Sequence, residues 1–262
     1  MSDVLTSFRA DGVATVTLNR PEVHNAFNDA VIAELTAIFQ RLGDDPAVRV
    51  VLLRGNGPSF SAGGDLNWMQ RMAGYTREQN REDALGLARM LRTLNEMPKP
   101  SVAVIHGATF AGGTGLVAAC DIALAADTVT FALTEVKLGL IPATIGPYVV
   151  AAMGARACRR YFLTAERFSA QEAHRLGLVH EVVPGDALEA AVEKVVGRLL
   201  EAGPRAVAES KRLIRDVTAR PIDDALLADT AERIAEARAS AEGREGVASF
   251  LEKRRPVWAD KR

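Results

Sequence analysis

The chain is poor in cysteine and in aromatic side chains, and it lacks long uncharged apolar runs. Two of its 262 residues are cysteines, and aromatic residues make up 5%. Cys120 and Cys158 have no metal-ligand spacing and lie in apolar, helix-prone surroundings, which predicts buried free thiols and a reducing compartment. No segment approaches the roughly 20 apolar residues of a membrane span, and the N-terminus has no basic-then-apolar signal pattern. We therefore expect a cytoplasmic enzyme or binding protein.

An excess of charge of either sign is also missing. The formal net charge is −1 at pH 7, which argues against nucleic acid as a partner and leaves room for a local basic patch that binds a small anion. Hydrophobic residues make up 48% and charged residues 25%, as in an ordinary soluble globular protein. No metal site is expected, because none of the four histidines has ligand spacing: His24, His106, His174 and His180.

Strand patterns alternate with helical patterns through most of the chain. This order predicts an α/β fold with buried sheets. Strands are expected at residues 13–18, 49–55, 101–107, 121–127 and 129–133, and helices at residues 29–42 and 77–97, the second of which ends at "PKP".

From about Asp186 the pattern changes to helices alone. They are expected at residues 188–200, 204–217, 221–237 and 244–253, with Pro204 and Pro221 in first turns. The region after Pro204 is too thin for a core of its own, so we expect it to pack on the main domain or on another subunit. The predicted division is a core of residues 1–203 and a helical region of residues 204–262.

A glycine cluster, "FAGGTGLVAACD", leads directly into an apolar helical run. Gly113, Gly115 and Ala118 match the dinucleotide-binding pattern G-x-G-x-x-A, and Glu135 lies about 20 residues further on. The surroundings argue against a dinucleotide site. The preceding strand ends well before Gly112, and the helix that follows is too short for a dinucleotide-binding fold. Glycines used only for tight packing are the other structural interpretation.

A second glycine segment, "FSAGGDLNWM", also follows a strand and leads into a helix. Asp65 is placed as the N-cap of that helix. Two such segments can bring two backbone N–H groups to one point, where they would stabilise an enolate or a tetrahedral oxyanion.

Glu135 stands between two apolar runs, and the sequence leaves its role open. One interpretation is a surface glutamate on a loop. The other is a partly buried carboxyl with a raised pKa that transfers protons beside a thioester carbonyl.

Several ordered motifs resemble the crotonase, or enoyl-CoA hydratase/isomerase, family over nearly the whole chain. The resemblance implies a crotonase-like spiral of strand–strand–helix repeats, a C-terminal helical trimerisation region, assembly as trimers or paired trimers, and an acyl-CoA thioester substrate with no separate cofactor. The motifs are "VTLNRPEVHNAFN", "FSAGGDL", "PKPSVAVIHGATFAGG", "CDIALAADTVTFALTEVKLGLIP", "LTAERFSAQEAHRLGLVHEVV" and "FLEKRRPVW".

The resemblance also assigns roles to individual residues. The two oxyanion donors fall on the N–H groups of Gly64 and Gly112, and the acid–base group falls on Glu135. Coenzyme A is expected along His24, Ala26, Ala62 and Gly64. Phe250 and Lys253 of a neighbouring subunit would add contacts; without that role, Phe250 would be a core residue and Lys253 a solvated one.

Two departures from the family pattern bear on the reaction. Gly115 stands where hydratases of the family typically carry a first glutamate, and "ATIGPYVV" replaces the usual glycine-rich turn. One carboxyl suffices to move a double bond, which favours an isomerase. Finer resemblance, in "SAGGDLNWM" and "RRYFLTAERFSAQEAHRLGLV", is to the methylglutaconyl-CoA and carboxygeranoyl-CoA hydratases, which act in leucine and acyclic terpene breakdown. We therefore predict a hydratase, with an isomerase and an inactive CoA-binding scaffold as alternatives.

Resemblance to these hydratases implies a β-methyl-branched acyl-CoA substrate that bears a distal carboxylate, and such a carboxylate would need a cation. Arg71, Arg77 and Arg81 lie in the segment that covers the acyl pocket in the family, with Trp68 nearby as a wall. Arginines on such a helix are more often simply solvated, so the sequence does not select one of them.

Overall fold

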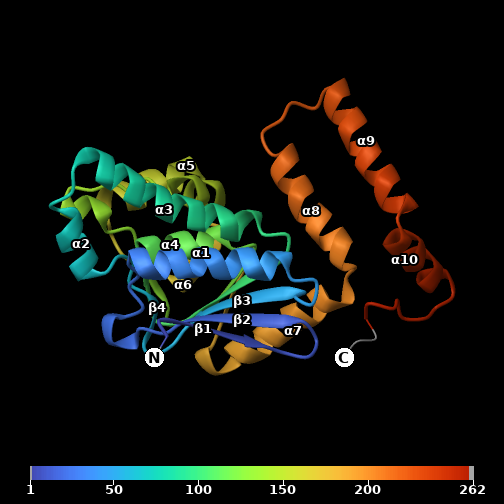
Figure 1. The fold of residues 1–262 in the computed structure, drawn as a ribbon, viewed down its shortest axis with the longest axis horizontal. Helices are drawn as coiled ribbons and strands as arrows, with labels where there is room; N and C mark the ends of the chain where they lie inside the picture. The colour runs from blue at the N-terminus through green and yellow to red at the C-terminus, as the bar shows by residue number, and fades with distance from the viewer. Residues whose placement is uncertain (1, 260–262) are drawn as a thin grey trace.

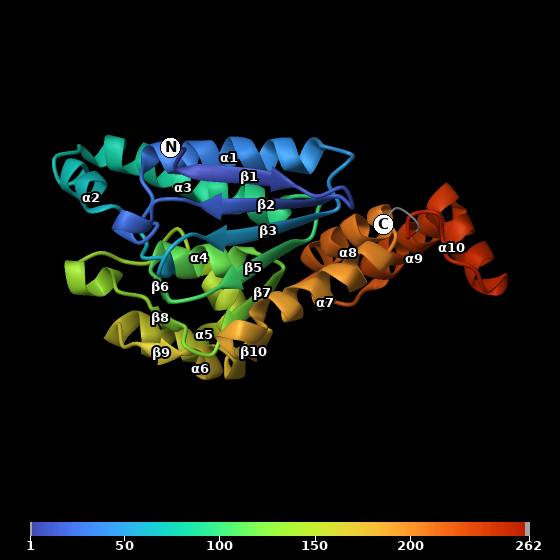
Figure 2. The ribbon, with the colours of Figure 1, turned by 90° about the horizontal axis from the view of Figure 1, so that it is seen from below.

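The computed structural model describes residues 2–259, in which two β-sheets lie among helices (Figures 1 and 2). The larger sheet has the strand order β1-β2-β3-β5-β7-β10, and every pair in it is parallel except β1 with β2. The smaller sheet has the order β4-β6-β8-β9, in which β9 alone is antiparallel. The strands are β1 (Val4–Phe8), β2 (Val13–Leu18), β3 (Val50–Gly55), β4 (Ser59–Ser61), β5 (Ser101–Ile105), β6 (Ala108–Phe110), β7 (Ile122–Ala126), β8 (Thr130–Ala132), β9 (Phe168–Ser169) and β10 (Glu181–Val183).

Helices connect the strands and cover both sheets, so the predicted α/β class is confirmed. The α-helices are α1 (Asp29–Asp44), α2 (Leu66–Met72), α3 (Arg77–Glu96), α4 (Gly112–Ala119), α5 (Gly146–Thr164), α6 (Ala170–Arg175), α7 (Leu188–Glu201), α8 (Pro204–Val217), α9 (Asp224–Ala239) and α10 (Ala241–Leu251). Short 3₁₀ helices accompany them within residues 2–259: η1 (Pro21–Val23), η2 (Glu135–Leu138) and η3 (Gly185–Ala187).

The apolar patterns in the sequence account for the core. On α1 the buried residues recur at helical spacing, and the side chain of Asn28 caps the helix by accepting a hydrogen bond from the Val31 N–H. Strand β5 is buried along its whole length, as expected for a parallel strand covered on both faces. Cys120 and Cys158 are free and buried as predicted, and burial raises the pKa of the Cys120 thiol to about 12.

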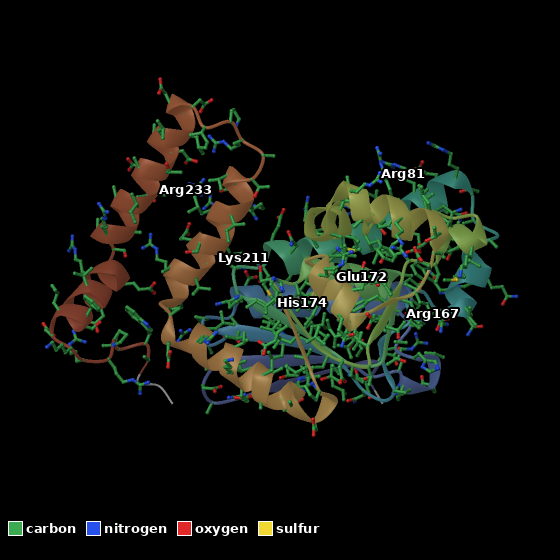
Figure 3. The ribbon with its side chains drawn as sticks, turned by 180° about the vertical axis from the view of Figure 1, so that it is seen from behind. Arg81, Arg167, Glu172, His174, Lys211 and Arg233 are labelled. Carbon is green, nitrogen blue, oxygen red and sulfur yellow. The ribbon has the colours of Figure 1, made fainter. Side chains whose placement is uncertain are left out.

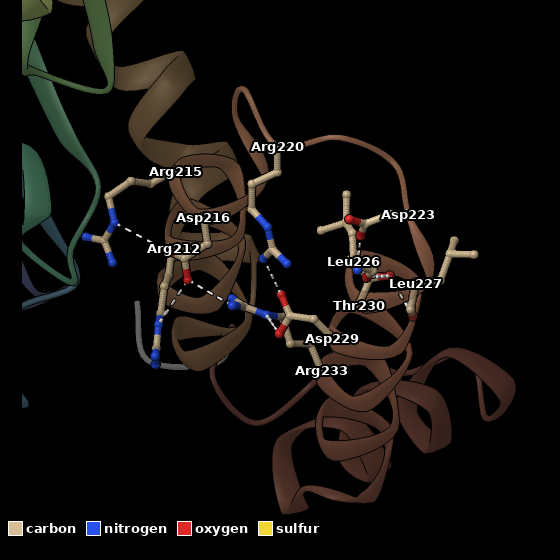
Figure 4. Close-up of polar contacts among 10 residues, drawn as sticks. All are labelled: Arg212, Arg215, Asp216, Arg220, Asp223, Leu226, Leu227, Asp229, Thr230 and Arg233. Atoms are coloured by element: carbon tan, nitrogen blue, oxygen red, sulfur yellow. Dashed lines mark hydrogen bonds and ion pairs between the residues drawn. The ribbon is translucent and has the colours of Figure 1, made fainter.

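The last three helices extend away from the sheets, to the right in Figure 1. Lys211 on α8 (Figure 3) bonds to the carboxylate of Asp121, 2.8 Å away, and so connects α8 to the residue that follows the α4 C-cap. Asp216 on α8 pairs with Arg233 on α9 over 2.9 Å and so joins the two helices, while Asp229, on α9 itself, holds the same arginine over 3.0 Å (Figure 4).

The expected starts of α9 and α10 were three residues off. Asp223 and Ser240 cap the two helices, and these local hydrogen bonds fix the starts at Asp224 and Ala241. Within residues 2–259, no helix is long and apolar enough to cross a bilayer.

Candidate active site

Two short parallel strands bring the two glycine segments together. Strand β4 ends at Ser61 and is followed by Ala62, Gly63 and Gly64, whereas β6 ends at Phe110 and is followed by Ala111 and Gly112. Because β4 and β6 pair in parallel, their carboxyl ends lie at the same edge of the sheet. An ideal Cβ on Gly63 would lie 2.9 Å from the Cβ of Ala111 and 3.4 Å from the Gly112 nitrogen, so the two segments are in direct contact.

The N–H groups of Gly64 and Gly112 are available to a ligand. Gly112 is the first residue of α4, and the N–H groups of a first helical turn have no partner within the helix. Gly64 bridges to Phe27, but its neighbours Gly63 and Asp65 make both backbone hydrogen bonds of that bridge. Among residues 2–259 neither the Gly64 nor the Gly112 N–H donates a hydrogen bond. Two free donors on contacting segments, one of them in the first turn of α4, suit an oxyanion.

Phe27 connects the two donor segments, and sequence patterns did not single it out. Its backbone N–H donates to the Gly63 carbonyl over 2.8 Å, and its carbonyl accepts from the Asp65 N–H over 3.0 Å. A Cβ on Gly112 would lie 2.3 Å from the Cζ of Phe27, so the ring packs directly on Gly112. Phe27 is 1% exposed and therefore holds both segments from inside the core.

Ala111 adopts a strained backbone conformation immediately before the Gly112 donor. Its φ is +47° and its ψ is −118°, a region that a residue with a side chain rarely occupies. Its N–H donates to the Ala132 carbonyl at the end of β8, over 2.8 Å. Strain of this kind costs about 1–3 kcal/mol and concentrates at functional sites.

The residues predicted to bind coenzyme A in one chain are also brought together. The Ala62 N–H donates to the His24 carbonyl over 2.9 Å, so this pair lies beside the bridge between Phe27 and Gly64. Ala26 is buried, whereas His24 is exposed and its Nδ1 lies 2.9 Å from the Ser59 hydroxyl.

Asp65 links the segment around Ala26 to the start of α2 through hydrogen bonds and an ion pair. As predicted, it caps α2, accepting hydrogen bonds from the N–H groups of Asn67 and Trp68. Arg20 donates to the Asp65 carboxylate over 2.8 Å and to the Ala26 carbonyl over 2.6 Å. Burial acts to raise the pKa of Asp65, but the hydrogen bonds from Arg20 and the two N–H groups outweigh it, and the pKa lies below its ordinary value.

Glu135 lies at the edge of the sheet that carries Gly112. Strand β8 pairs with β6, and Glu135 begins η2 three residues after β8 ends. It is half-buried, its Oε2 atom is buried, and that atom has no hydrogen-bond partner within residues 2–259. Burial raises the pKa of this carboxyl. The interpretation as a solvated surface glutamate is therefore wrong, and a group that takes up and releases protons is compatible with this environment.

Phe250 and Lys253 lie apart from these residues within the chain. Phe250 is on α10 and Lys253 follows it, across the molecule from α2 and α4 (Figure 1). Phe250 is 80% exposed, so its interpretation as a core residue is wrong. Contacts of both residues with coenzyme A on a neighbouring subunit stay a prediction.

The glycines of the dinucleotide pattern serve close packing instead. A Cβ on Gly113 would lie 2.5 Å from the Ser61 carbonyl oxygen, and a Cβ on Gly115 would lie 2.2 Å from the Cγ2 of Ile145. Both glycines therefore face protein atoms, which leaves no room for a pyrophosphate beside them. Within residues 2–259, no group of three or more His, Cys, Asp or Glu side chains is placed to hold a metal ion.

Comparison with known proteins gives a consistent result. The family model described as enoyl-CoA hydratase/isomerase matches residues 9–261. A crotonyl-CoA hydratase from Syntrophomonas wolfei is 32% identical over 97% of this chain and 96% of its own. The crystal structure of an enoyl-CoA hydratase from Shewanella pealeana superposes with a TM-score of 0.95, at 43% identity, over 98% of this chain and 96% of that one. A Legionella pneumophila structure assigned as an enoyl-CoA hydratase/isomerase (crotonase) gives 0.93 at 44% identity, over 98% and 99%.

Proposed function

Because this chain belongs to the enoyl-CoA hydratase/isomerase family, we propose that it adds water to an α,β-unsaturated acyl-CoA thioester. The observation that carries the proposal is that the free N–H groups of Gly64 and Gly112 lie on two contacting segments, at the sheet edge that also carries Glu135 with its buried Oε2.

The geometry supports a division of the chemistry between donors and acid. The thioester oxygen accepts hydrogen bonds from Gly64 and Gly112, which become stronger as the oxygen gains enolate charge. Water adds at Cβ and a proton arrives at Cα. As the water oxygen bonds to Cβ, the Glu135 carboxylate takes one proton from that water and then delivers it to Cα, because position 115 offers no second carboxyl. No metal or separate cofactor enters this scheme.

The same single carboxyl is the observation that favours a Δ3–Δ2 isomerase as a second candidate. Moving a double bond needs one base that carries a proton between Cα and Cγ. We place the hydratase first because the finer sequence resemblance is to hydratases of β-methyl-branched acyl-CoA thioesters.

An assay in H₂¹⁸O separates these candidates. The substrates are 3-methylglutaconyl-CoA, crotonyl-CoA and 3-hexenoyl-CoA, with products resolved by mass. We expect a product heavier by one labelled water, formed fastest from the branched substrate. An unchanged mass with a migrated double bond would identify the chain as an isomerase. Binding of coenzyme A without turnover of any substrate would identify it as an inactive CoA-binding scaffold.

For a substrate with a distal carboxylate, we propose Arg77 as the cation, because it is the least engaged of the three arginines considered. Arg71 is paired with Asp29 and Arg81 with Glu78, whereas Arg77, the first residue of α3, has no ion-pair partner among the described residues. A positive charge at the N-terminal end of a helix is repelled by the helix dipole, and Arg77 has no carboxylate partner within residues 2–259 to offset this, so an anionic ligand would stabilise it.

The variant Arg77→Met should raise KM for 3-methylglutaconyl-CoA roughly 10- to 100-fold, the scale of one charge-assisted hydrogen bond. KM for crotonyl-CoA, which has no distal carboxylate, should change little. Arg89→Met, on the same helix and paired with Glu82, is the matched control. Equal effects of Arg77→Met on both substrates would contradict the assignment.

We also propose that the chain assembles as trimers or pairs of trimers through its helical region, residues 204–262. The exposed apolar residues of α10 support this proposal, among them Val247, Phe250 and Leu251, which are 60%, 80% and 72% exposed. Such residues become buried when a second copy covers them. Phe250 and Lys253 would then reach the coenzyme A bound to the neighbouring chain.

A further inference from the structure

Ile145 occupies the space into which any side chain at position 115 would project. Gly115 lies in α4, three residues after Gly112, and is buried. A Cβ built on it would lie 2.2 Å from Ile145 Cγ2 and 2.7 Å from Ile145 Cβ. Carbon atoms in contact are separated by about 3.5–4.0 Å, so Ile145 is seated directly against the bare backbone of Gly115. The two departures from the family pattern, Gly115 and the segment "ATIGPYVV" that contains Ile145, are therefore in contact with each other.

The same contact connects α4 to the segment that carries Glu135. Ile145 is the N-cap residue of α5, it is 2% exposed, and its carbonyl accepts hydrogen bonds from the Tyr148 and Val149 N–H groups, each over 3.1 Å. Ten residues earlier, the Glu135 carbonyl accepts from the Leu140 N–H over 3.1 Å. Helix α5 packs against both η2 and α4. The chain therefore runs from Glu135 to Ile145, where it contacts α4, the helix that begins with the Gly112 donor.

We propose that Ile145 is a positioning residue for the proton-transfer step, an inference that rests on the proposed roles of Glu135 and the Gly112 N–H. Seated against Gly115, its side chain sets the separation between α4 and the Glu135 segment. The thioester oxygen is fixed by the donors on Gly64 and Gly112, so the reach of Glu135 to Cα depends on this separation. A β-branched side chain suits a spacer, because it has few rotamers.

Proton transfer is sensitive to such a separation. A displacement of about 1 Å can cost roughly 10²-fold in rate even when it originates away from the reacting atoms. Ile145 does not itself present a polar atom to the substrate. Its loss should therefore reduce kcat and leave KM nearly unchanged.

The test compares Ile145→Val and Ile145→Ala on the enoyl-CoA thioester that wild type converts fastest in the labelled-water assay. We expect Ile145→Ala to lower kcat about 10- to 100-fold with KM within threefold, and Ile145→Val, which keeps both γ carbons, to stay within about threefold in kcat. Ile38→Ala, in the core on α1, is the matched control: it should lower the unfolding free energy and keep kcat.

A second measurement serves if Ile145→Ala folds poorly. Gly115→Ala alone should be destabilised by its overlap with Ile145. In Gly115→Ala/Ile145→Gly the nearest atom of residue 145 to the new methyl is its Cα, 3.7 Å away. This double variant should be more stable than Gly115→Ala and have a higher kcat than Ile145→Gly.

The inference is overturned if Ile145→Ala keeps kcat within twofold of wild type, or if its loss lies wholly in KM, since Ile145 would then serve packing or binding alone. It is also overturned if the double variant regains stability without kcat. Failure of the proposed function looks different: either wild type turns over no substrate, or Glu135→Gln keeps full activity.

Discussion

Replacing Glu135 with glutamine is expected to lower kcat by roughly 10²–10⁴-fold, the scale of a general acid–base group. Glutamine keeps the size of the side chain and can still form hydrogen bonds, but it cannot take up or release a proton. The thioester oxygen would still bind the Gly64 and Gly112 N–H groups, so KM should change little. Steady-state rates with the substrate preferred by wild type measure both constants. Glu22→Gln, at an exposed carboxyl on η1, is the control and should behave as wild type.

The same substitution should increase stability at neutral pH. Burial raises the pKa of Glu135 in the folded chain, so folding favours its protonated form. The stabilising contribution of that form is complete below the unfolded pKa, about 4.3, and is lost as the pH rises through the folded pKa. Glu135→Gln should therefore gain in unfolding free energy over wild type as the pH rises through this window. Loss of activity together with loss of stability would instead indicate a damaged fold.

Local signals in the sequence were enough to predict several parts of this site. A capping aspartate and glycine turns act over a few neighbouring residues, so Asp65 and both glycine segments were located correctly. The strands expected before the two segments were β3 and β5, but β4 and β6 lie in between and lead directly into the segments. Strands of three residues are too short to show an alternating pattern, and these were missed for that reason.

Contacts between distant segments could not be predicted from local patterns. The ring of Phe27 packs on Gly112, and Ile145 packs on Gly115, across separations of 85 and 30 residues in the chain. Burial decides whether Glu135 is a surface side chain, and burial depends on how η2 packs against α5. Both glycine packing and carboxyl burial are tertiary properties, so the sequence left the alternatives for Gly115 and Glu135 open.

The second large effect is expected from Asp65→Ala, which should lower the unfolding free energy by about 3–5 kcal/mol, as when one partner of a buried ion pair is removed. Asp65 is 3% exposed and accepts hydrogen bonds from Arg20 and from the Asn67 and Trp68 N–H groups. Alanine would leave the Arg20 charge, whose side chain is 15% exposed, without this partner and would also uncap α2. Denaturant unfolding at one fixed protein concentration measures the loss.

Asp65→Asn separates the ion pair from the cap, because asparagine also caps helices but carries no charge. It should be less destabilising than Asp65→Ala at pH 7. The folded pKa of Asp65 is lowered, so the wild-type advantage over Asp65→Asn is present above the unfolded pKa, about 3.9, and disappears as the pH falls through the folded pKa. If wild type remained more stable than Asp65→Asn at still lower pH, the stabilisation by Asp65 would come from the shape of its side chain and not from its charge.

Activity should fall with stability in Asp65→Ala, because the same residue fixes a donor. Asp65 follows Gly64 directly, and its N–H bonds to the Phe27 carbonyl, while Arg20 holds its carboxylate and the Ala26 carbonyl. Releasing this junction loosens Gly64, whose N–H is one of the two proposed oxyanion donors. Loss of one oxyanion donor costs roughly 10²–10³-fold in kcat, so Asp65→Ala should lose activity at temperatures where it is still folded. If Asp65→Ala is folded and keeps the wild-type kcat, the backbone hydrogen bonds of Phe27 alone are enough to position the Gly64 N–H.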